Sequence, residues 1–369
     1  MDTHLSDALV IGAGIAGATA GAHLIATHRV TLLEAEEVAG YHSTGRSAAI
    51  WILNYGGADA RILTGASRAF FETPPPAFSD TPLTQPRAIL SLADAAQLPA
   101  LEASLAEGTG LERLEVEQAR ALVPAIRADY AVAATIERDA FDIDVAALHQ
   151  GFLKQIKAGG GALALRHRAG RIWRADGLWH AEATTGDIHA APVLVNAAGA
   201  WGDVVAGLAG VAPIGLQPKR RTALIVDPGA HDSAHWPLVG DVAHSWYVRP
   251  EARRKLMVSP ADETDTEPCD AQPDELDVAI GVDRMQQALD IPVHRVEHRW
   301  AGLRTFTPDR GLAIGAGAAP GFFWLCGQGG YGIQTAPAAG RLLAHLVRGT
   351  EPEPDIIAAI ALTDPRRFA

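Results

Sequence analysis

Three glycines and one acidic residue near the start of the chain have the types and spacing of a nucleotide-binding site. Gly12, Gly14 and Gly17 follow the apolar run Ala8–Ile11, and Glu34 closes a second apolar run about 20 residues beyond the first glycine. The first glycine permits a tight turn, the second lets a pyrophosphate approach the backbone, and the third lets a helix pack closely on a strand. The carboxylate is placed to accept hydrogen bonds from a ribose diol. This spacing predicts a dinucleotide site.

The elements that must position these residues are a strand, a helix and a second strand. The apolar residues 8–11 predict a strand buried on both faces, and the alanine-rich residues 18–26 predict a helix. The start of that helix, at Ile15 and Ala16, would present backbone N–H groups and a positive dipole end to phosphates. An acid after the second strand, 30–33, disfavours NADP and leaves NAD and FAD as alternatives.

Composition excludes several classes of protein. The 369 residues suffice for a large core and two domains. A net charge of −12 argues against nucleic acid or an anionic membrane as partner, because both repel an acidic surface. Cys269 and Cys326 make no disulfide framework and fit a reducing cytoplasm. We expect no secretory signal, no transmembrane segment and no metal site, since no stretch has the required pattern.

The order of the predicted elements indicates a nucleotide-binding domain interrupted twice by a cap. We assign residues 1–48, 140–216 and 300–369 to the first and residues 49–139 and 217–299 to the second. The cap is predicted to contain a helix at 61–72, a strand at 87–92, two helices on either side of 107–110, strands at 222–226, 246–249 and 255–258, and a helix at 274–288. The nucleotide-binding domain is predicted to contain a helix at 145–157, an antiparallel meander near 163, 172, 179 and 188, strands at 193–195 and 322–325, and a helix at 333–347.

Residues 41–49 form a predicted loop beside the nucleotide. Small residues, hydroxyls, one glycine and one arginine suit a loop lying against an anionic or aromatic ligand. The alternative is a capped helix start at Ser43 or Thr44. We favour the ligand because the loop directly follows the dinucleotide unit.

These motifs, in this order, resemble those of the FAD-dependent D-amino-acid oxidoreductases. The glycine motif, 43–47, 196–201, 302–304 and 327–334 carry the likeness, which covers essentially the whole chain. The segments 41–49, 216–221 and 328–335 most resemble bacterial D-arginine dehydrogenases. The resemblance implies an α/β fold: a Rossmann-like FAD-binding domain with an α+β substrate-binding cap, as in D-amino-acid oxidase and glycine oxidase.

The resemblance also implies the site residues. FAD would bind non-covalently, with its adenosine on the first strand–helix–strand unit. Arg221 and Arg304 would bind the substrate carboxylate, and Tyr55 and Tyr247 would frame the substrate. Gly330, Tyr331 and Gln334 would face the flavin and the amine. Further cofactor contacts would come from Ser43, Thr44, Arg46, Ser47, Ala48, Ala198, Gly199, Trp201, Gly329, Gly330, Gly332, Ile333, Gln334 and Thr335.

Physical chemistry supports the arginines in this role. A guanidinium presents a planar fork that binds a carboxylate through two parallel hydrogen bonds. Arg220 and Arg221 alternate across a predicted strand, so only one can face the site, and we favour Arg221. The alternatives are a surface role for Arg304 and core packing for the tyrosines. A helix starting near Gly332 would direct its positive end at the flavin, and Cys326 fits a core position better than a flavin attachment.

Two positions depart from the arginine dehydrogenases. A glutamate that meets the substrate guanidinium corresponds to Ile89, and a histidine corresponds to Ile50. With Leu238 they predict an apolar pocket wall, where a guanidinium would be desolvated without compensation. We therefore expect a neutral or apolar D-amino acid. No obvious general base is left, so the amine would lose its proton to solvent or to a water held by Tyr55.

The expected reaction is oxidative deamination. Hydride transfer from Cα to flavin N5 would give an imine, which hydrolyses to the 2-oxo acid and ammonia. A quinone, a dye or O₂ would re-oxidise the flavin, and a quinone would allow peripheral membrane association of this cytoplasmic protein. The alternatives are a secondary-amine oxidase of the sarcosine or glycine oxidase kind, a non-catalytic flavin-binding protein and an NAD-dependent dehydrogenase.

Overall fold

The nucleotide-binding part is built on a mixed sheet. The computed structural model describes residues 3–368. Within them, six strands run in the order β10-β3-β2-β14-β22-β21, all parallel except the pair β21–β22. Their bounds are β2 Ala8–Ile11, β3 Val30–Leu33, β10 Ala162–Ala164, β14 Val193–Asn196, β21 Ala313–Ala316 and β22 Phe322–Cys326. The strands β2, β3, β14 and β22 are apolar runs, as expected for strands covered on both faces.

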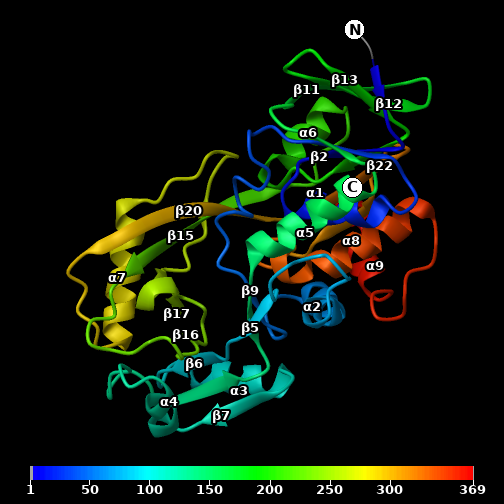
Figure 1. The fold of residues 1–369 in the computed structure, drawn as a ribbon. Coiled ribbons are helices and arrows are strands. Elements are labelled where there is room, and N and C mark those ends of the chain that lie inside the picture. The colour runs from blue at the N-terminus through cyan, green and yellow to red at the C-terminus, as the bar shows by residue number, and fades with distance from the viewer. Residues whose placement is uncertain (1–2, 369) are drawn as a thin grey trace.

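Layers of different kinds cover the two faces of this sheet (Figure 1). Helices cover one face: α1 Ile15–Leu24, α2 Ala58–Glu72, α5 Val145–Ala158, α8 Gly332–Arg348 and α9 Ala359–Thr363. The other face packs against a four-stranded sheet of order β1-β13-β12-β11 and against α6. The bounds of that layer are β1 Thr3–Leu5, β11 Ala169–Ala175, β12 Leu178–Ala183, β13 Ile188–Ala191, η1 Gly199–Trp201 and α6 Gly202–Leu208.

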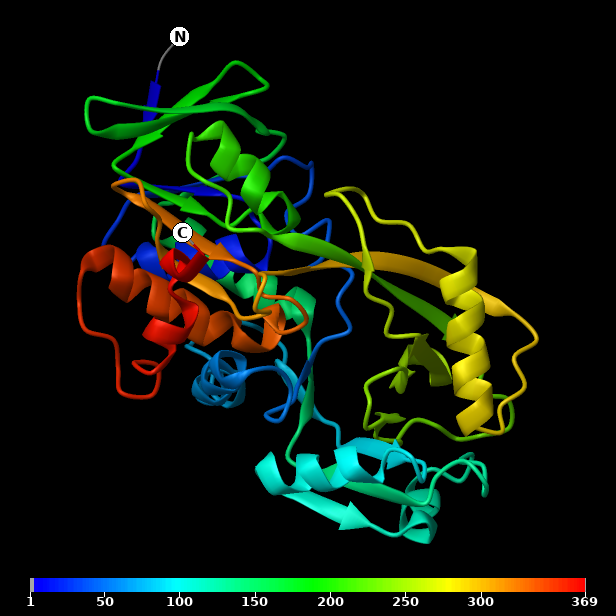
Figure 2. The same cartoon turned by 180° about the vertical axis from the view of Figure 1, so that it is seen from behind.

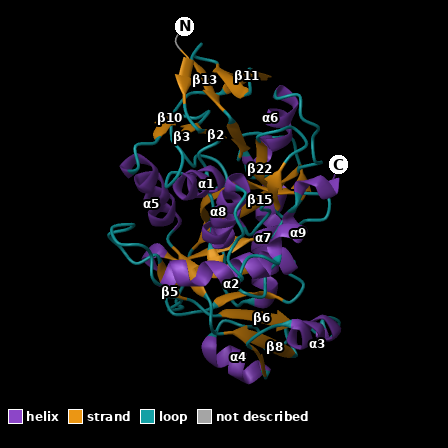
Figure 3. Ribbon diagram, turned by 90° about the vertical axis from the view of Figure 1, so that its right-hand side faces the viewer, coloured by secondary structure: helices purple, strands orange, loops and turns teal. Residues whose placement is uncertain are grey.

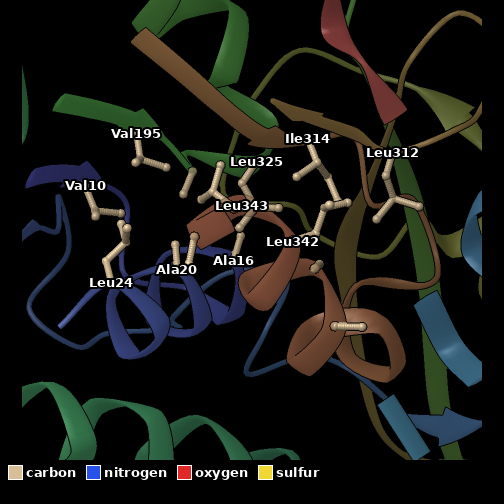
Figure 4. Packing of buried hydrophobic residues seen from close by; sticks show 14 of the residues in the cluster. Val10, Ala16, Ala20, Leu24, Val195, Leu312, Ile314, Leu325, Leu342 and Leu343 are labelled. Carbon is tan, nitrogen blue, oxygen red and sulfur yellow. The ribbon is translucent and has the colours of Figure 1, made fainter. Parts of the chain in front are cut away.

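The core beneath the helices explains why α1 and α8 lie where they do. Val10 and Val195 from the sheet meet Ala16 and Ala20 of α1 and Leu342 of α8 (Figure 4). Small side chains on α1 and α8 let these helices approach closely. A Cβ atom on Gly340 would lie only 2.3 Å from the Thr19 hydroxyl oxygen. The site-bearing ends of both helices are therefore held rigidly over the sheet.

A second large sheet forms the cap. Its strand order is β19-β15-β18-β17-β16-β6-β8-β7, and β20 pairs with β15. The strands are β6 Ile89–Ala93, β7 Leu111–Leu114, β8 Ala133–Glu137, β15 Gln217–Val226, β16 Leu238–Asp241, β17 Tyr247–Glu251, β18 Lys255–Ser259, β19 Thr264–Asp265 and β20 Val296–Phe306. The remaining cap elements are α3 Leu98–Glu107, α4 Val116–Leu122, η2 Ala252–Arg254 and α7 Glu275–Ala288. Figure 3 shows α3 and α4 beside β6 and β8, at the end of the molecule remote from β11 and β13.

Two long strands connect the nucleotide-binding part to the cap. The antiparallel pair β15 and β20 extends from the first part into the second, beside α7 (Figure 2). Arg221 on β15 lies opposite Gly302 on β20, and Lys219 lies opposite Arg304. Both predicted carboxylate-binding arginines therefore belong to one two-stranded ribbon. A small sheet, β4 Ile50–Trp51, β9 Phe141–Ile143 and β5 Thr84–Pro86, lies at the other connection.

Two sequence-based assignments were wrong. The helix at 61–72 was assigned to the cap, but α2 packs on α8 through Ala60 and Leu63, because its apolar face fits the nucleotide-binding core. The residues near 163 were assigned to the meander, but β10 pairs with β3 in the main sheet. The two helices predicted on either side of 107–110 are present as α3 and α4, and a strand that was not predicted, β7, lies between them. In residues 3–368 no helix combines the length and apolarity needed to cross a bilayer.

Candidate functional site: two adjoining cavities

Two adjoining cavities run between the sheet, its helices and the cap. The larger, called the main cavity here, has a volume of about 940 Å³ and is lined by residues of α8, β15, β16, β17, β20, β6 and β8. The smaller, called the nucleotide cavity, has a volume of about 270 Å³ and is lined by the β2–α1 turn, the end of β3 and residues 197–201. They share five lining residues: Ile15, Ser43, Thr44, Leu303 and Gly329. Together they form one elongated binding space.

The glycine motif shapes the nucleotide cavity through close backbone contacts. Gly12 has a φ of 98°, and a Cβ atom there would lie 2.6 Å from Ala197 O. A Cβ atom on Gly17 would lie 1.8 Å from Gly12 O, so α1 can begin here only if this residue is glycine. Gly14 faces the Thr44 hydroxyl across a cradle of small residues.

Glu34 holds the turn as well as lining the cavity. One of its carboxylate oxygens accepts from Ala13 N at 2.9 Å and the other accepts from Glu36 N at 2.9 Å. Thr44 accepts from Ile15 N at 2.9 Å. A buried residue that sequence reasoning missed also contributes: His149 Nε2 lies 2.8 Å from Ala13 O. Its position in the middle of α5 gave no signal of this contact.

Most of the predicted cofactor residues line the two cavities. Ala16, Ala198, Gly199 and Trp201 line the nucleotide cavity, where the Trp201 ring lies 4.6 Å from the His42 ring. Lining the main cavity are Ser47, Ala48, Gly330, Gly332, Ile333 and Gln334. A cradle of glycines, an acid at the end of β3 and a continuous elongated space fit a flavin dinucleotide.

The side chains of three predicted cofactor residues form hydrogen bonds with other parts of the protein. The Arg46 guanidinium donates to Ala271 O at 2.9 Å and pairs with Asp270, so it joins this loop to the cap. Thr335 lies outside both cavities and donates to Tyr331 O at 2.9 Å. Gln334 accepts from Ile52 N at 3.1 Å and thereby holds the chain after β4.

The predicted substrate-binding groups converge at the start of α8. Arg304 Nη1 donates to the Tyr55 hydroxyl at 3.0 Å. A Cβ atom on Gly330 would lie 2.8 Å from Arg304 Nη1 and 2.9 Å from the Tyr55 oxygen, so a side chain there would displace these two groups from their present positions. The rings of Tyr55 and Tyr331 meet edge to face at 5.2 Å. No side chain caps α8, whose N-terminus faces this space.

The two neighbouring arginines of β15 point to opposite sides. Arg221 lines the main cavity, where its Nε donates to Asp262 O at 2.8 Å and its Nη2 lies 3.3 Å from a Glu263 oxygen. Arg220 points away and pairs with Asp277 of α7 at 2.7 Å. Strand alternation thus places Arg221, not Arg220, beside Arg304.

The electrostatic environment of this cluster is positive. Burial tends to raise the pKa of Tyr247, but the Arg304 and Arg221 guanidinium groups outweigh it, and the pKa is lowered. Burial raises the pKa of Tyr331 to about 12. Burial lowers the pKa of Arg221, and the charge of Arg304 lowers it further. Two cations facing one cavity favour an anionic ligand.

The predicted apolar wall is present as one cluster. Ile50, Ile89 and Leu238 contact one another together with Ile52 and Ala140. Both Ile50 and Ile89 are buried, and Ile50, Ile89 and Leu238 all line the main cavity. The cluster lies on the cap side of the tyrosines and arginines, where β4, β6 and β16 meet.

Sequence reasoning missed a histidine at the main cavity. His244 lies in the turn between β16 and β17, with a φ of 54°, and its ring is 5.9 Å from the Tyr55 ring. Burial lowers its pKa; the Asp241 carboxylate opposes this shift and the charge of Arg221 adds to it, and the net pKa lies below the ordinary value. Asp241 fixes the turn by accepting from Ser245 N at 2.7 Å. In the sequence, only its position three residues before the predicted site residue Tyr247 could have indicated that His244 lines the cavity.

Comparison with known proteins assigns the family. A family model described as FAD dependent oxidoreductase matches residues 7–346. The chain belongs to this family. FAD is accordingly its cofactor, and the glycine cradle, Glu34 and the adjoining cavities are the residues and spaces that fit it.

Relatives of this FAD dependent oxidoreductase are distant in sequence. "FAD-dependent oxidoreductase domain-containing protein 1" of Bos taurus is 29% identical over 176 residues, which cover 42% of this chain and 35% of the relative. The Xenopus laevis protein of the same name is 26% identical over 178 residues, covering 42% of this chain and 34% of the relative. The chain thus matches about a third of the length of these curated relatives.

Solved structures share the fold over nearly the whole chain. L-proline dehydrogenase from P. horikoshii has a TM-score of 0.84 at 20% identity, covering 100% of this chain and 98% of that one. Iminodiacetate oxidase from Chelativorans sp. BNC1 has a TM-score of 0.82 at 21% identity, covering 97% and 98%. Glycine oxidase from Geobacillus kaustophilus has a TM-score of 0.81 at 20% identity, covering 95% and 96%.

Proposed function

We propose that this flavoprotein oxidises a D-amino acid with a neutral or apolar side chain to the imine, which water converts to the 2-oxo acid and ammonia. One observation carries the proposal most directly. Within residues 3–368, the Arg304 guanidinium hydrogen-bonds only the Tyr55 hydroxyl and forms no ion pair. A guanidinium so placed, beside a second cation, favours a bound carboxylate as its partner.

Chain residues would orient the substrate. Arg304 and Arg221 would bind the carboxylate, while the hydroxyls of Tyr55 and Tyr247 would accept or donate hydrogen bonds beside it. The isoleucine and leucine wall would exclude water from the side chain. Fixing the carboxylate and the side chain positions the Cα–H bond, and such positioning accounts for much of enzymatic rate acceleration.

When bound, the flavin supplies a two-electron acceptor for the hydride that leaves Cα. The substrate amine must also lose protons, and we propose that a water held by the Tyr55 hydroxyl accepts the first. The uncapped N-terminus of α8 would stabilise negative charge that develops nearby.

The preference for the D configuration and for a neutral side chain rests on separate arguments. The first rests on the resemblance of residues 41–49, 216–221 and 328–335 to D-amino-acid oxidoreductases. The second rests on Ile50, Ile89 and Leu238, because a charged group facing them would be desolvated without a partner. We also propose non-covalent FAD, a cytoplasmic location, and a quinone, dye or O₂ as acceptor.

Anaerobic bleaching of the yellow protein by a panel of D- and L-amino acids tests the proposal. We expect D-norleucine and similar neutral D-amino acids to bleach the flavin faster than their L forms, with D-arginine a poor substrate. The opposite enantiomer preference, or fastest bleaching by D-arginine, would overturn the specificity. Within the same panel, faster bleaching by N-methylglycine or proline would favour a secondary-amine oxidase, which the apolar wall could also serve by holding an N-alkyl group.

A further inference from the structure

The main cavity continues beyond the apolar wall into the cap. Its lining there comes from one face of β6 and β8 and from α3. In the register of this pair, Ile89 lies opposite Glu137 and Ser91 lies opposite Thr135. Because alternate residues of a strand share a face, these four side chains lie on the same face of the sheet. Leu90 and the other intervening residues instead fill the core behind it.

Two hydroxyl groups face this outer part of the cavity. Ser91 and Thr135 are cross-strand neighbours that both line the cavity, and Thr135 is only 4% exposed. Within residues 3–368 neither hydroxyl has a hydrogen-bond partner. Thr135 is buried, Ser91 is half-buried, and both residues line the cavity, so this pair is suited to hydrogen-bond a polar group of a ligand.

A carboxylate lies beside these hydroxyls on β8. Glu137 is 5% exposed, and one of its oxygens accepts from Leu53 N at 2.9 Å. Burial raises its pKa, although the Asn54 amide and the Leu53 N–H oppose the shift. Glu137 forms no ion pair in the part of the chain that the structure describes. It therefore offers an acceptor to a hydrogen-bond donor.

The cavity consequently has two chemically different ends. Arg221 and Arg304 make the reacting end positive, while the outer end presents Glu137 and two hydroxyls. The strands from β17 to β8 are successive neighbours, so Tyr247 and Thr135 are three strand spacings apart, roughly 14 Å. Ile89 and Leu238 lie between the two ends.

We propose that Ser91, Thr135 and Glu137 form a subsite for the end of the substrate's side chain. The substrate would have an aliphatic stem of methylene groups against Ile89 and Leu238, and a neutral hydrogen-bond-donating tip such as an amide or a hydroxyl group. This subsite rests on the proposed function and narrows it. A wholly apolar side chain would leave the two hydroxyls and the carboxylate without a ligand partner, so it is a poorer match than one with a polar tip.

The test compares substrates of similar length with different tips. The holoenzyme is assayed with D-norleucine, D-glutamine and 6-hydroxy-D-norleucine, and kcat/KM is measured for each. We expect kcat/KM for D-glutamine or 6-hydroxy-D-norleucine to exceed that for D-norleucine by roughly five- to thirtyfold, the value of one hydrogen bond. A wild-type enzyme that prefers D-norleucine to both would overturn the subsite while leaving the proposed function intact. Failure of every D-amino acid to bleach the flavin would overturn both.

Variants assign the preference to named residues. Thr135→Val is nearly isosteric, and we expect it to reduce the ratio of kcat/KM for D-glutamine to that for D-norleucine by roughly tenfold; Ser91→Ala should reduce it in the same direction. Glu137→Gln should reduce the ratios for both polar substrates, because a carboxamide oxygen is a weaker hydrogen-bond acceptor than a carboxylate oxygen. An unchanged ratio in Thr135→Val and Ser91→Ala would overturn the subsite.

Ser233→Ala is the matched control. Ser233 is a buried cap residue whose hydroxyl has no hydrogen-bond partner among residues 3–368, and it lies outside the main cavity. The ratio of kcat/KM for D-glutamine to that for D-norleucine should be the same in Ser233→Ala as in the wild type. Flavin content and Tm, measured for every variant, show that the changed ratios come from folded, loaded enzyme.

Discussion

Arg304 illustrates how one side chain can determine what a cavity binds. Its neighbours supply a phenol and a glycine rather than a carboxylate, so the charge is left available to a ligand. Glycine at position 330 is part of the same arrangement, because any side chain there would occupy the space of the guanidinium. Ligand binding at this point therefore depends on the charge of Arg304 and on the absence of a side chain at Gly330.

Replacing Arg304 should weaken substrate binding strongly. Arg304→Met removes charge-assisted hydrogen bonds worth about 2–3 kcal/mol, so kcat/KM for a D-amino acid should fall by roughly 30- to 200-fold, mostly through KM. Steady-state kinetics measure this. Arg220→Met is the control, since Arg220 points toward α7, and its KM should remain close to the wild-type value. Equal effects of the two substitutions would contradict the assignment.

At the scale of elements, the packing of α1 explains both binding and stability. The helix begins within contact distance of β2 at Gly17, and its last turn carries His23, whose Nδ1 lies 2.9 Å from Thr19 O. The same helix contacts α8 through Gly340. A substitution at Gly17, near the start of α1, should therefore affect FAD binding, whereas a substitution at His23, in its last turn, should affect the free energy of unfolding.

Gly17→Ala should abolish FAD retention. The added Cβ would lie 1.8 Å from Gly12 O, so α1 or the glycine turn must move. The purified variant should be colourless, with a lower Tm. Gly207→Ala in α6 is the matched control, because within residues 3–368 an added Cβ would have no atom within 4 Å apart from its chain neighbours and the nearby backbone of its own helix. This variant should retain flavin, and its free energy of unfolding should rise by roughly 0.5–1 kcal/mol. A yellow Gly17→Ala protein would contradict this prediction.

His23 should make stability depend on pH. Burial lowers its pKa from 6.5 to about 4, so the unfolded chain takes up the proton first as the pH falls. The contribution of the neutral imidazole to the free energy of unfolding is complete above pH 6.5 and is lost as the pH falls toward 4. The loss is at most roughly 3 kcal/mol. Urea denaturation at pH 7.5, 5.5 and 4.5 measures the change. His23→Gln should flatten the curve in this window, and parallel curves would disprove the assignment.

At the scale of the whole molecule, one ion pair joins the cofactor loop to the cap. Arg46 pairs with Asp270 and donates to Ala271 O, and its guanidinium lies 5.2 Å from the Tyr41 ring. Since the 43–47 loop lines both cavities, this pair should affect how tightly FAD is held.

Double-mutant analysis can measure that connection. Arg46→Met and Asp270→Asn should each raise the FAD Kd several-fold, and the double variant should be no worse than the more affected single variant. The coupling is expected to be below about 1 kcal/mol, because Asp270 is 48% exposed and solvent screens the pair. Raising the ionic strength should reduce the coupling further. Additive losses would show that the two residues act separately.

Sequence predicted the features that depend on nearby residues. The glycine cradle with Glu34 could be predicted because its spacing is local. Strand alternation predicted that only one of Arg220 and Arg221 faces the cavity, and in the structure it is Arg221. The location of α2 could not, because an apolar helix face does not specify which surface covers it. Glu137 was missed because its neighbour across the sheet, Ile89, is remote in sequence. The residues of the outer cavity become apparent only when β6 and β8 are paired.

The β15–β20 ribbon carries both arginines on a single rigid unit, whereas the residues expected to choose the side chain come mainly from β4, β6, β8 and β16. The means of holding an acid group and the means of discriminating between substrates are therefore physically separable. A chimera that keeps this ribbon and exchanges residues 84–137 for those of another cap should acquire a different side-chain specificity and still bind the substrate carboxylate. Substrate range in this fold could therefore diverge through changes on the cap side of the cavity alone.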